Sequence, residues 1–167
     1  SELAPGRLNK AFFTLGGSEA NENAIKLARM YTRKNKIFSR YISYHGATMG
    51  SITLSGDYRR PPVEPGIPGV VHFFDPYCYR CTFGHTPHTC HRECVTHLEE
   101  MILNEGPQTV AAVIMEGVTG SNGILVPPDD YWPRIREITK KYDVLLISDE
   151  VMSGFGRTGE WFAVDHW

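Results

Sequence analysis

Two short, wholly apolar runs constrain the fold of this chain more than any other feature of its sequence. Val110–Met115 reads VAAVIM and Val144–Ser148 reads VLLIS, so neither run alternates between apolar and polar residues. A strand with one face in water alternates, whereas a strand covered by helices on both faces does not. The two runs therefore predict buried strands in a mainly parallel sheet.

The segments around these runs alternate between strand-like and helix-like patterns. Further strands are expected at Ala11–Leu15, Lys36–Ser43 and Val70–Phe74. Helices are expected after Ser18, over Ala47–Leu54, over Glu93–Glu105 and after Asp129 or Asp130. This alternation predicts an α/β fold of three layers, in which helices cover both faces of the sheet and ligands bind outside the carboxyl ends of the strands.

Composition excludes several classes of protein. The 167 residues are enough for one domain with a core, and 41% of them are hydrophobic. The net charge of −2 and the absence of a basic block in the sequence argue against nucleic acid as a partner. No apolar run approaches the roughly 18 residues of a membrane span, so no membrane partner and a cytoplasmic location are expected. The ends at Ser1 and Trp167 suggest a fragment.

A glycine turn precedes the first expected helix. Gly16 and Gly17 allow a tight turn with close approach of a ligand to the backbone, and Ser18 is expected to cap the helix. The unpaired N–H groups of the first helical turn and the helix dipole favour an anion such as a phosphate. An ordinary turn between a strand and a helix, which binds nothing, remains the alternative.

Four polar side chains each follow a different expected strand. These are Ser18, Tyr44, Glu116 and Asp149. Parallel strands end at the same edge of a sheet, so one crevice can hold all four. A solvated loop acid is the alternative for Glu116, and a turn or helix-capping aspartate is the alternative for Asp149.

A loop at 76–94 is rich in cysteine and histidine and is interpreted as an insertion. Its four cysteines form a CxxC pair and a CxxxC pair: Cys78, Cys81, Cys90 and Cys94. Two ligand pairs in a short loop are typical of structural zinc, so a zinc site is expected there. Reduced, unliganded cysteines remain the alternative.

Three other functions fit the sequence less well. Apolar strands ending in acids also occur in ATPases, but the chain has no GxxxxGK[ST] motif. A nicotinamide-binding domain is disfavoured because the turn reads GGSEAN rather than GxGxxG. A purely structural zinc-binding module would leave the glycine turn and Asp149 unexplained.

Together, the motifs resemble those of the pyridoxal-phosphate-dependent class III aminotransferases, of fold type I. GGSEANENAIKLAR, from Gly16, is similar to the phosphate-binding turn and helix of this family. The YHG motif at Tyr44 is similar to its ring-stacking turn, and DEVMSGFGRTGEWFA, from Asp149, to its cofactor-anchoring strand end. The resemblance covers essentially the whole chain and implies part of the large cofactor domain.

The resemblance also implies roles for individual residues. The cofactor-binding residues would be Gly17, Ser18, Tyr44, His45, Asp149 and Val151. The first two would hold the phosphate, Tyr44 and Val151 would lie on the two faces of the pyridine ring, and Asp149 would meet the ring nitrogen. A buried carboxylate there keeps the ring protonated, so that the ring can accept electrons from the substrate. Asp149 and Glu116 are the candidate catalytic residues.

The implied activity is transfer of an amino group from an amine or amino acid to a 2-oxo acid such as pyruvate. A homodimer is implied as well. Ser121 and Met152 stand where ornithine- and GABA-type members have glutamate and glutamine, which disfavours those substrates. Decarboxylases and aminomutases share this scaffold and cofactor and remain alternatives. The Schiff-base lysine and the small domain are expected beyond Trp167.

Overall fold

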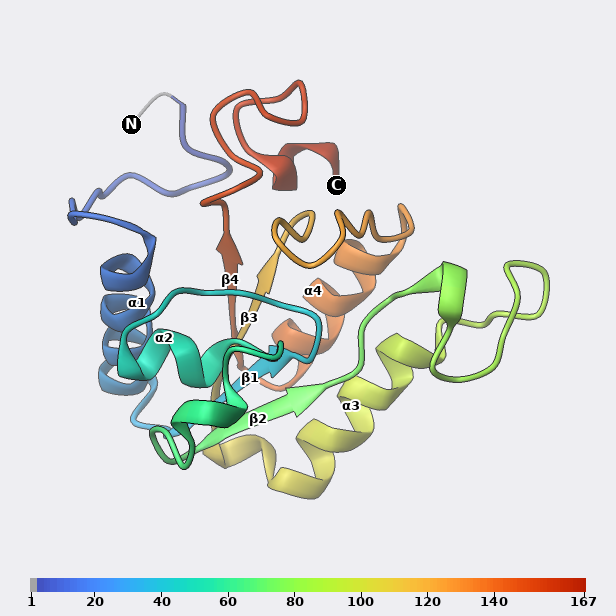
Figure 1. Ribbon diagram of the computed structural model, residues 1–167, viewed down its shortest axis with the longest axis horizontal. Helices are drawn as coiled ribbons and strands as arrows, with labels where there is room; N and C mark the ends of the chain where they lie inside the picture. The colour runs from blue at the N-terminus through green and yellow to red at the C-terminus, as the bar shows by residue number, and fades with distance from the viewer. Residues whose placement is uncertain (1–2) are drawn as a thin grey trace.

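Four parallel strands form the centre of the computed structural model, which describes residues 3–167 (Figure 1). They are β1 (Lys36–Arg40), β2 (Val70–Phe73), β3 (Val110–Glu116) and β4 (Leu145–Asp149). The strand order is β2-β1-β3-β4, and every neighbouring pair is parallel. The mainly parallel sheet predicted from the sequence is confirmed.

Helices cover both faces of this sheet. They are α1 (Gly17–Thr32), α2 (Met49–Leu54), α3 (Glu93–Glu105) and α4 (Tyr131–Lys141). Figure 1 shows α1 and α2 on one side of the strands and α3 and α4 on the other. Short 3₁₀ turns occur at Pro61–Val63, Cys78–Arg80, Pro107–Thr109 and Ala163–His166. The three-layer α/β architecture is therefore the one expected.

The central strand β3 explains why its sequence shows no alternation. Ala112 and Ile114 pack in the cluster that includes residues of α1 and α2, whereas Val113 and Met115 pack in the cluster that includes residues of α3 and α4. All seven residues of β3 are buried. Side chains alternate between the two faces of the strand, and both faces are covered. Each side chain must therefore be apolar or have a hydrogen-bond partner.

The strand predicted at Ala11–Leu15 is wrong for the described chain. This segment leads into α1 without pairing to any strand within residues 3–167. Phe13 is 91% exposed and Leu15 is fully exposed. Apolar and aromatic residues favour a strand only where a neighbour supplies the ladder of hydrogen bonds, and the described sheet supplies none at this position.

The zinc site predicted at the four cysteines is not supported by the structure. Within residues 3–167, no group of three or more histidine, cysteine or acidic side chains lies close enough to hold a metal ion. All four cysteines are free thiols, with Cys78 exposed and Cys94 buried in α3. Burial, the largest cause, and the neighbouring thiols raise the pKa of Cys94 to about 12, so this residue is a neutral thiol in the metal-free protein.

No helix among the described residues has the length and apolar character needed to cross a membrane.

Candidate active site

A cavity of about 280 Å³ lies at the carboxyl ends of β1, β3 and β4, against the first turn of α1. Its lining includes every predicted cofactor-binding residue: Gly17, Ser18, Tyr44, His45, Asp149 and Val151. The second predicted catalytic residue, Glu116, lines it too. The strand-end side chains that lie far apart in the sequence therefore meet in one place, as the parallel topology requires.

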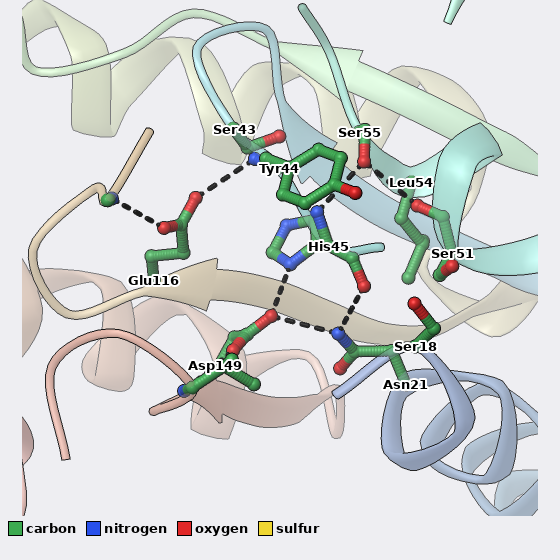
Figure 2. A network of polar contacts seen from close by, with 12 residues as sticks. Ser18, Asn21, Ser43, Tyr44, His45, Ser51, Leu54, Ser55, Glu116 and Asp149 are labelled. Carbon is green, nitrogen blue, oxygen red and sulfur yellow. Dashed lines mark hydrogen bonds and ion pairs between the residues drawn. The ribbon is translucent and has the colours of Figure 1, made fainter. Parts of the chain in front are cut away.

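Asp149 is the last residue of β4 and lies at the centre of a polar network (Figure 2). Its Oδ2 accepts hydrogen bonds from His45 Nδ1 at 2.7 Å and from Asn21 Nδ2 at 2.9 Å. Its Oδ1 accepts one from the backbone N–H of Val151 at 3.0 Å. The residue is 5% exposed, so its orientation is set by these three donors.

The same donors keep the Asp149 carboxylate ionised. Burial, the largest single influence, would raise the pKa of Asp149, but the hydrogen bonds from His45, Val151 and Asn21 together lower it below its ordinary value. An ionised carboxylate only accepts hydrogen bonds, so His45 must carry its proton on Nδ1. Asp149 does make a turn contact, through Oδ1 and the N–H of Val151, but its other oxygen also binds side chains from two distant segments.

His45 has a second ring nitrogen, Nε2, which is buried and has no hydrogen-bond partner among residues 3–167. His45 is buried and lines the cavity. Buried polar atoms in folded proteins are normally paired, so an unpaired one next to a cavity marks a place where a bound group is expected.

Asn21 is a site residue that the sequence reasoning missed. Besides Asp149, its Nδ2 donates to the backbone oxygen of His45 at 2.7 Å, so one amide joins α1 to the turn after β1 and to the end of β4. The sequence could have indicated Asn21, because it is a polar residue on the apolar face of the helix that also carries Ile25 and Ala28. A polar side chain on a buried face needs a hydrogen-bond partner.

The turn at Tyr44, His45 and Gly46 is fixed through its backbone. Tyr44 N–H donates to Glu116 Oε1 at 3.0 Å, and His45 N–H donates to Ser55 Oγ at 2.8 Å. These bonds hold the Tyr44 ring against the cavity and leave the His45 ring directed at Asp149 (Figure 2).

Ser18 contributes to this turn rather than capping its own helix. The capping position of α1 is Gly16, and no side chain caps it, so the predicted role of Ser18 as the cap is wrong. Ser18 Oγ instead accepts a hydrogen bond from the backbone N–H of Ala47 at 3.1 Å. Since the Ser18 hydroxyl binds Ala47 and no side chain caps α1, the backbone N–H groups of the first helical turn remain available to an anion.

Glu116 holds two loops rather than projecting into solvent. It is 3% exposed, and its Oε2 accepts a hydrogen bond from the backbone N–H of Gly120 at 2.7 Å while Oε1 binds Tyr44. The alternative of a solvated loop acid is therefore excluded. With both oxygens bound to backbone donors, Glu116 positions the Tyr44 turn and the segment that contains Ser121. A catalytic role for it stays a prediction.

A buried ion pair supports the strand ends beneath the cavity. Arg40, the last residue of β1, donates from Nη2 to the backbone oxygen of Glu116 at 2.8 Å, and its Nε lies 3.5 Å from Asp75 Oδ1. Asp75 Oδ2 accepts from the backbone N–H of Ile42 at 2.7 Å. Burial raises the pKa of Asp75 despite the adjacent guanidinium, and the pair joins β1, β3 and the segment after β2.

The loop after β4 is held by Glu150, another residue that the sequence reasoning missed. Its carboxylate accepts hydrogen bonds from Ser153 Oγ, Ala163 N–H and Val164 N–H at 2.9–3.2 Å. This fixes the start of the loop and with it Val151. Gly17 allows Val151 to approach α1, because a Cβ on Gly17 would lie 2.7 Å from Val151 Cγ2.

These features fit the cofactor implied by the sequence. The first turn of α1 offers free backbone N–H groups for a phosphate, and Tyr44 and Val151 present an aromatic and an aliphatic surface for a ring. Asp149 adds a buried negative charge that suits a protonated ring nitrogen. The residues present would therefore hold pyridoxal phosphate.

Comparison with known proteins agrees with this geometry. The family model for class-III aminotransferases matches residues 1–167. The putrescine–pyruvate aminotransferase of Pseudomonas aeruginosa is 41% identical over 176 residues, which cover 100% of this chain and 38% of that protein. The taurine–pyruvate aminotransferase of Bilophila wadsworthia is 41% identical over 169 residues, which cover 97% of this chain and 37% of that protein.

Among solved structures, the chain resembles a taurine:2-oxoglutarate aminotransferase from Bifidobacterium kashiwanohense in complex with pyridoxal phosphate and glutamate. The two are 46% identical with a TM-score of 0.85, over 91% of this chain and 35% of that one. The chain thus spans well under half the length of these proteins. Because the family model covers its whole length, the chain belongs to the class III aminotransferase family.

Proposed function

We propose that the full-length protein carrying these residues is a pyridoxal-phosphate-dependent aminotransferase. It would move an amino group from an amine or amino acid to a 2-oxo acid such as pyruvate. The observation that carries this proposal is the ionised, buried Asp149 in a cavity bounded by Tyr44, Val151 and the free first turn of α1. The family and its transaminase relatives support the same activity.

Each residue then has a defined task. When bound, pyridoxal phosphate supplies an electron sink for the pair released as the substrate loses a proton. Gly17 and Ser18 would hold the phosphate through their backbone N–H groups, and Tyr44 would fix the plane of the ring. Asp149, oriented by His45 and Asn21, would hold a proton on the ring nitrogen.

We also propose that the full-length protein is a homodimer. Support comes from large apolar side chains that are exposed in the described residues, among them Phe13, Leu15, Phe155 and Trp161. Exposed apolar surface of this kind marks contact with another molecule. Light scattering on the full-length protein would measure its mass.

The proposed activity can be tested with the purified full-length protein, pyridoxal phosphate and pyruvate. With an amine donor present, we expect alanine to accumulate, and we expect no alanine from protein freed of the cofactor. Binding of the cofactor is measured separately by equilibrium dialysis. Release of carbon dioxide from an amino acid without formation of alanine would contradict the proposal and indicate a decarboxylase.

A further inference from the structure

A cationic side chain touches two residues that line the cavity. The guanidinium of Arg59, on the loop between α2 and β2, lies 4.4 Å from the centre of the Tyr44 ring. Its Nη1 donates a hydrogen bond to Ser121 Oγ at 3.2 Å. Tyr44 and Ser121 both belong to the cavity lining and come from different loops. Arg59 therefore lies next to the cavity, in contact with two residues of its lining that come from different loops.

The position of Arg59 is fixed before any ligand arrives. Asp57 Oδ2 accepts a hydrogen bond from Arg59 Nη1 at 2.6 Å, and Asp57 Oδ1 accepts one from its backbone N–H at 2.9 Å. The guanidinium also lies over the Tyr58 ring, 4.9 Å from its centre. Aromatic stacking and a carboxylate partner hold the planar group in one orientation, so little conformational entropy remains to be lost on binding.

Arg59 keeps donors free for a ligand. A guanidinium has five N–H donors, and among the described residues both side-chain hydrogen bonds of Arg59 leave from Nη1. The side chain is 31% exposed, whereas the side chain of its partner Asp57 is 7% exposed. The free edge of the guanidinium is therefore open to solvent and suited to the oxygens of a carboxylate or sulfonate.

The one acid that pairs with Arg59, Asp57, binds Nη1, and the acids of the cavity are bound elsewhere. Glu116 binds backbone N–H groups with both oxygens, and Asp149 is bound by His45, Asn21 and Val151. Ser121, which contacts Arg59 directly, is uncharged. An acidic residue at position 121 would place a second carboxylate beside the guanidinium, in addition to Asp57, and would repel an anion.

Building on the proposed aminotransferase function, we propose that Arg59 is a specificity-determining residue that binds the anionic group of the amine substrate. Its guanidinium selects amines that also carry a carboxylate or a sulfonate. It disfavours diamines, whose second ammonium group it repels. The carboxylate-bearing and sulfonate-bearing amines share one feature: an anionic oxygen group separated from the reacting amine by a short apolar chain.

The test uses the full-length holoenzyme and its Arg59→Gln variant. The donors are 2-aminoethanesulfonate, 3-aminopropanoate and uncharged propylamine, each with pyruvate. Loss of a charge-assisted hydrogen bond should lower the ratio of kcat/KM for the anionic donors to that for propylamine by roughly 10- to 100-fold, mainly through KM. The anionic donor with the larger loss shows whether the site suits sulfonate or carboxylate.

Two further variants sharpen the result. Ser121→Glu leaves the guanidinium in place but should lower the same ratio, because it adds a second carboxylate beside Arg59 that repels an anion. Arg80→Gln removes an equal charge from an exposed residue that stacks on Tyr79, outside the cavity lining, and should leave the ratio unchanged. A ratio that stays constant in Arg59→Gln and Ser121→Glu would overturn the proposal.

A binding measurement separates this proposal from the proposed enzymatic activity. Ethanesulfonate and propanoate carry the anion but no amine, so calorimetry measures their binding without turnover. We expect both Arg59→Gln and Ser121→Glu to weaken the binding of at least one of these anions, even if the wild-type protein transfers no amino group. Equal affinity in the wild type and both variants contradicts the role of Arg59, whatever the outcome of the transamination assay.

Discussion

Replacing Asp149 by asparagine is expected to lower kcat of the proposed aminotransferase reaction in the full-length protein by at least about 100-fold, the scale of losing one fixed electrostatic partner in a buried site. Asparagine has nearly the same shape and keeps one acceptor oxygen for His45 and Asn21, so the negative charge disappears while only the Val151 N–H loses its acceptor. Asp129→Asn, at an exposed position before α4, is the matched control and should keep full activity. The measurement is alanine formation from pyruvate under saturating cofactor.

The pH dependence of stability follows from the same carboxylate. Because the pKa of Asp149 is lowered in the folded protein, its network stabilises the fold at every pH above the unfolded value of about 3.9, and this contribution is lost as pH falls through the folded pKa. The destabilisation of Asp149→Asn relative to wild type should therefore be constant from neutral pH down to about 4 and shrink below that. A difference that grows on acidification would contradict the assigned charge state.

Replacing Gly46 by alanine is expected to lower the free energy of unfolding of the full-length protein by about 2 kcal/mol or more and to weaken cofactor binding. A Cβ at this position would overlap Ser18 Oγ and would lie 2.6 Å from Ser51 Oγ. The φ of Gly46 is also +129°, which side-chain-bearing residues rarely adopt. Relief of the overlap requires moving the first turn of α1 away from the Tyr44 turn, which opens the proposed phosphate site.

Gly123→Ala provides the control for this substitution. Gly123 has a φ of +99°, but a Cβ there would meet nothing within 4 Å, so this variant carries backbone strain without crowding. Urea denaturation of the two variants measures the difference in stability, and equilibrium dialysis measures the affinity for pyridoxal phosphate. If Gly46→Ala loses no more stability and no more affinity than Gly123→Ala, the close approach of the two segments does not hold the site together.

Much of the fold could be predicted because local pattern and burial agree. The bounds expected for the helix at Glu93–Glu105 are those observed for α3, and the unbroken apolar run at Val110–Met115 became the fully buried β3. The prediction failed at Ala11–Leu15, where the residue types favour a strand but pairing depends on a neighbour. A strand is a property of two segments, so one segment alone does not determine it.

The candidate site could be predicted from the sequence where topology alone determines a residue's position, and not where its position depends on contacts between distant segments. Residues at strand ends, such as Tyr44 and Asp149, follow from topology, because parallel strands bring their carboxyl ends together. Asn21 and Glu150 were missed because their partners lie in other segments or across a loop, and single-sequence patterns do not report such contacts. The cysteine spacing suggested zinc, but spacing alone does not show whether the thiols converge.

The central claim is that Asp149 holds a proton on the ring nitrogen of the bound cofactor. The most direct measurement is the ¹⁵N NMR shift of pyridoxal phosphate labelled at that nitrogen, bound to the full-length protein and to its Asp149→Asn variant. A shift typical of a protonated pyridine in the wild type, and of an unprotonated one in Asp149→Asn, is the predicted result. The same shift in both proteins would contradict the assignment of Asp149 and, with it, the chemistry proposed for this site.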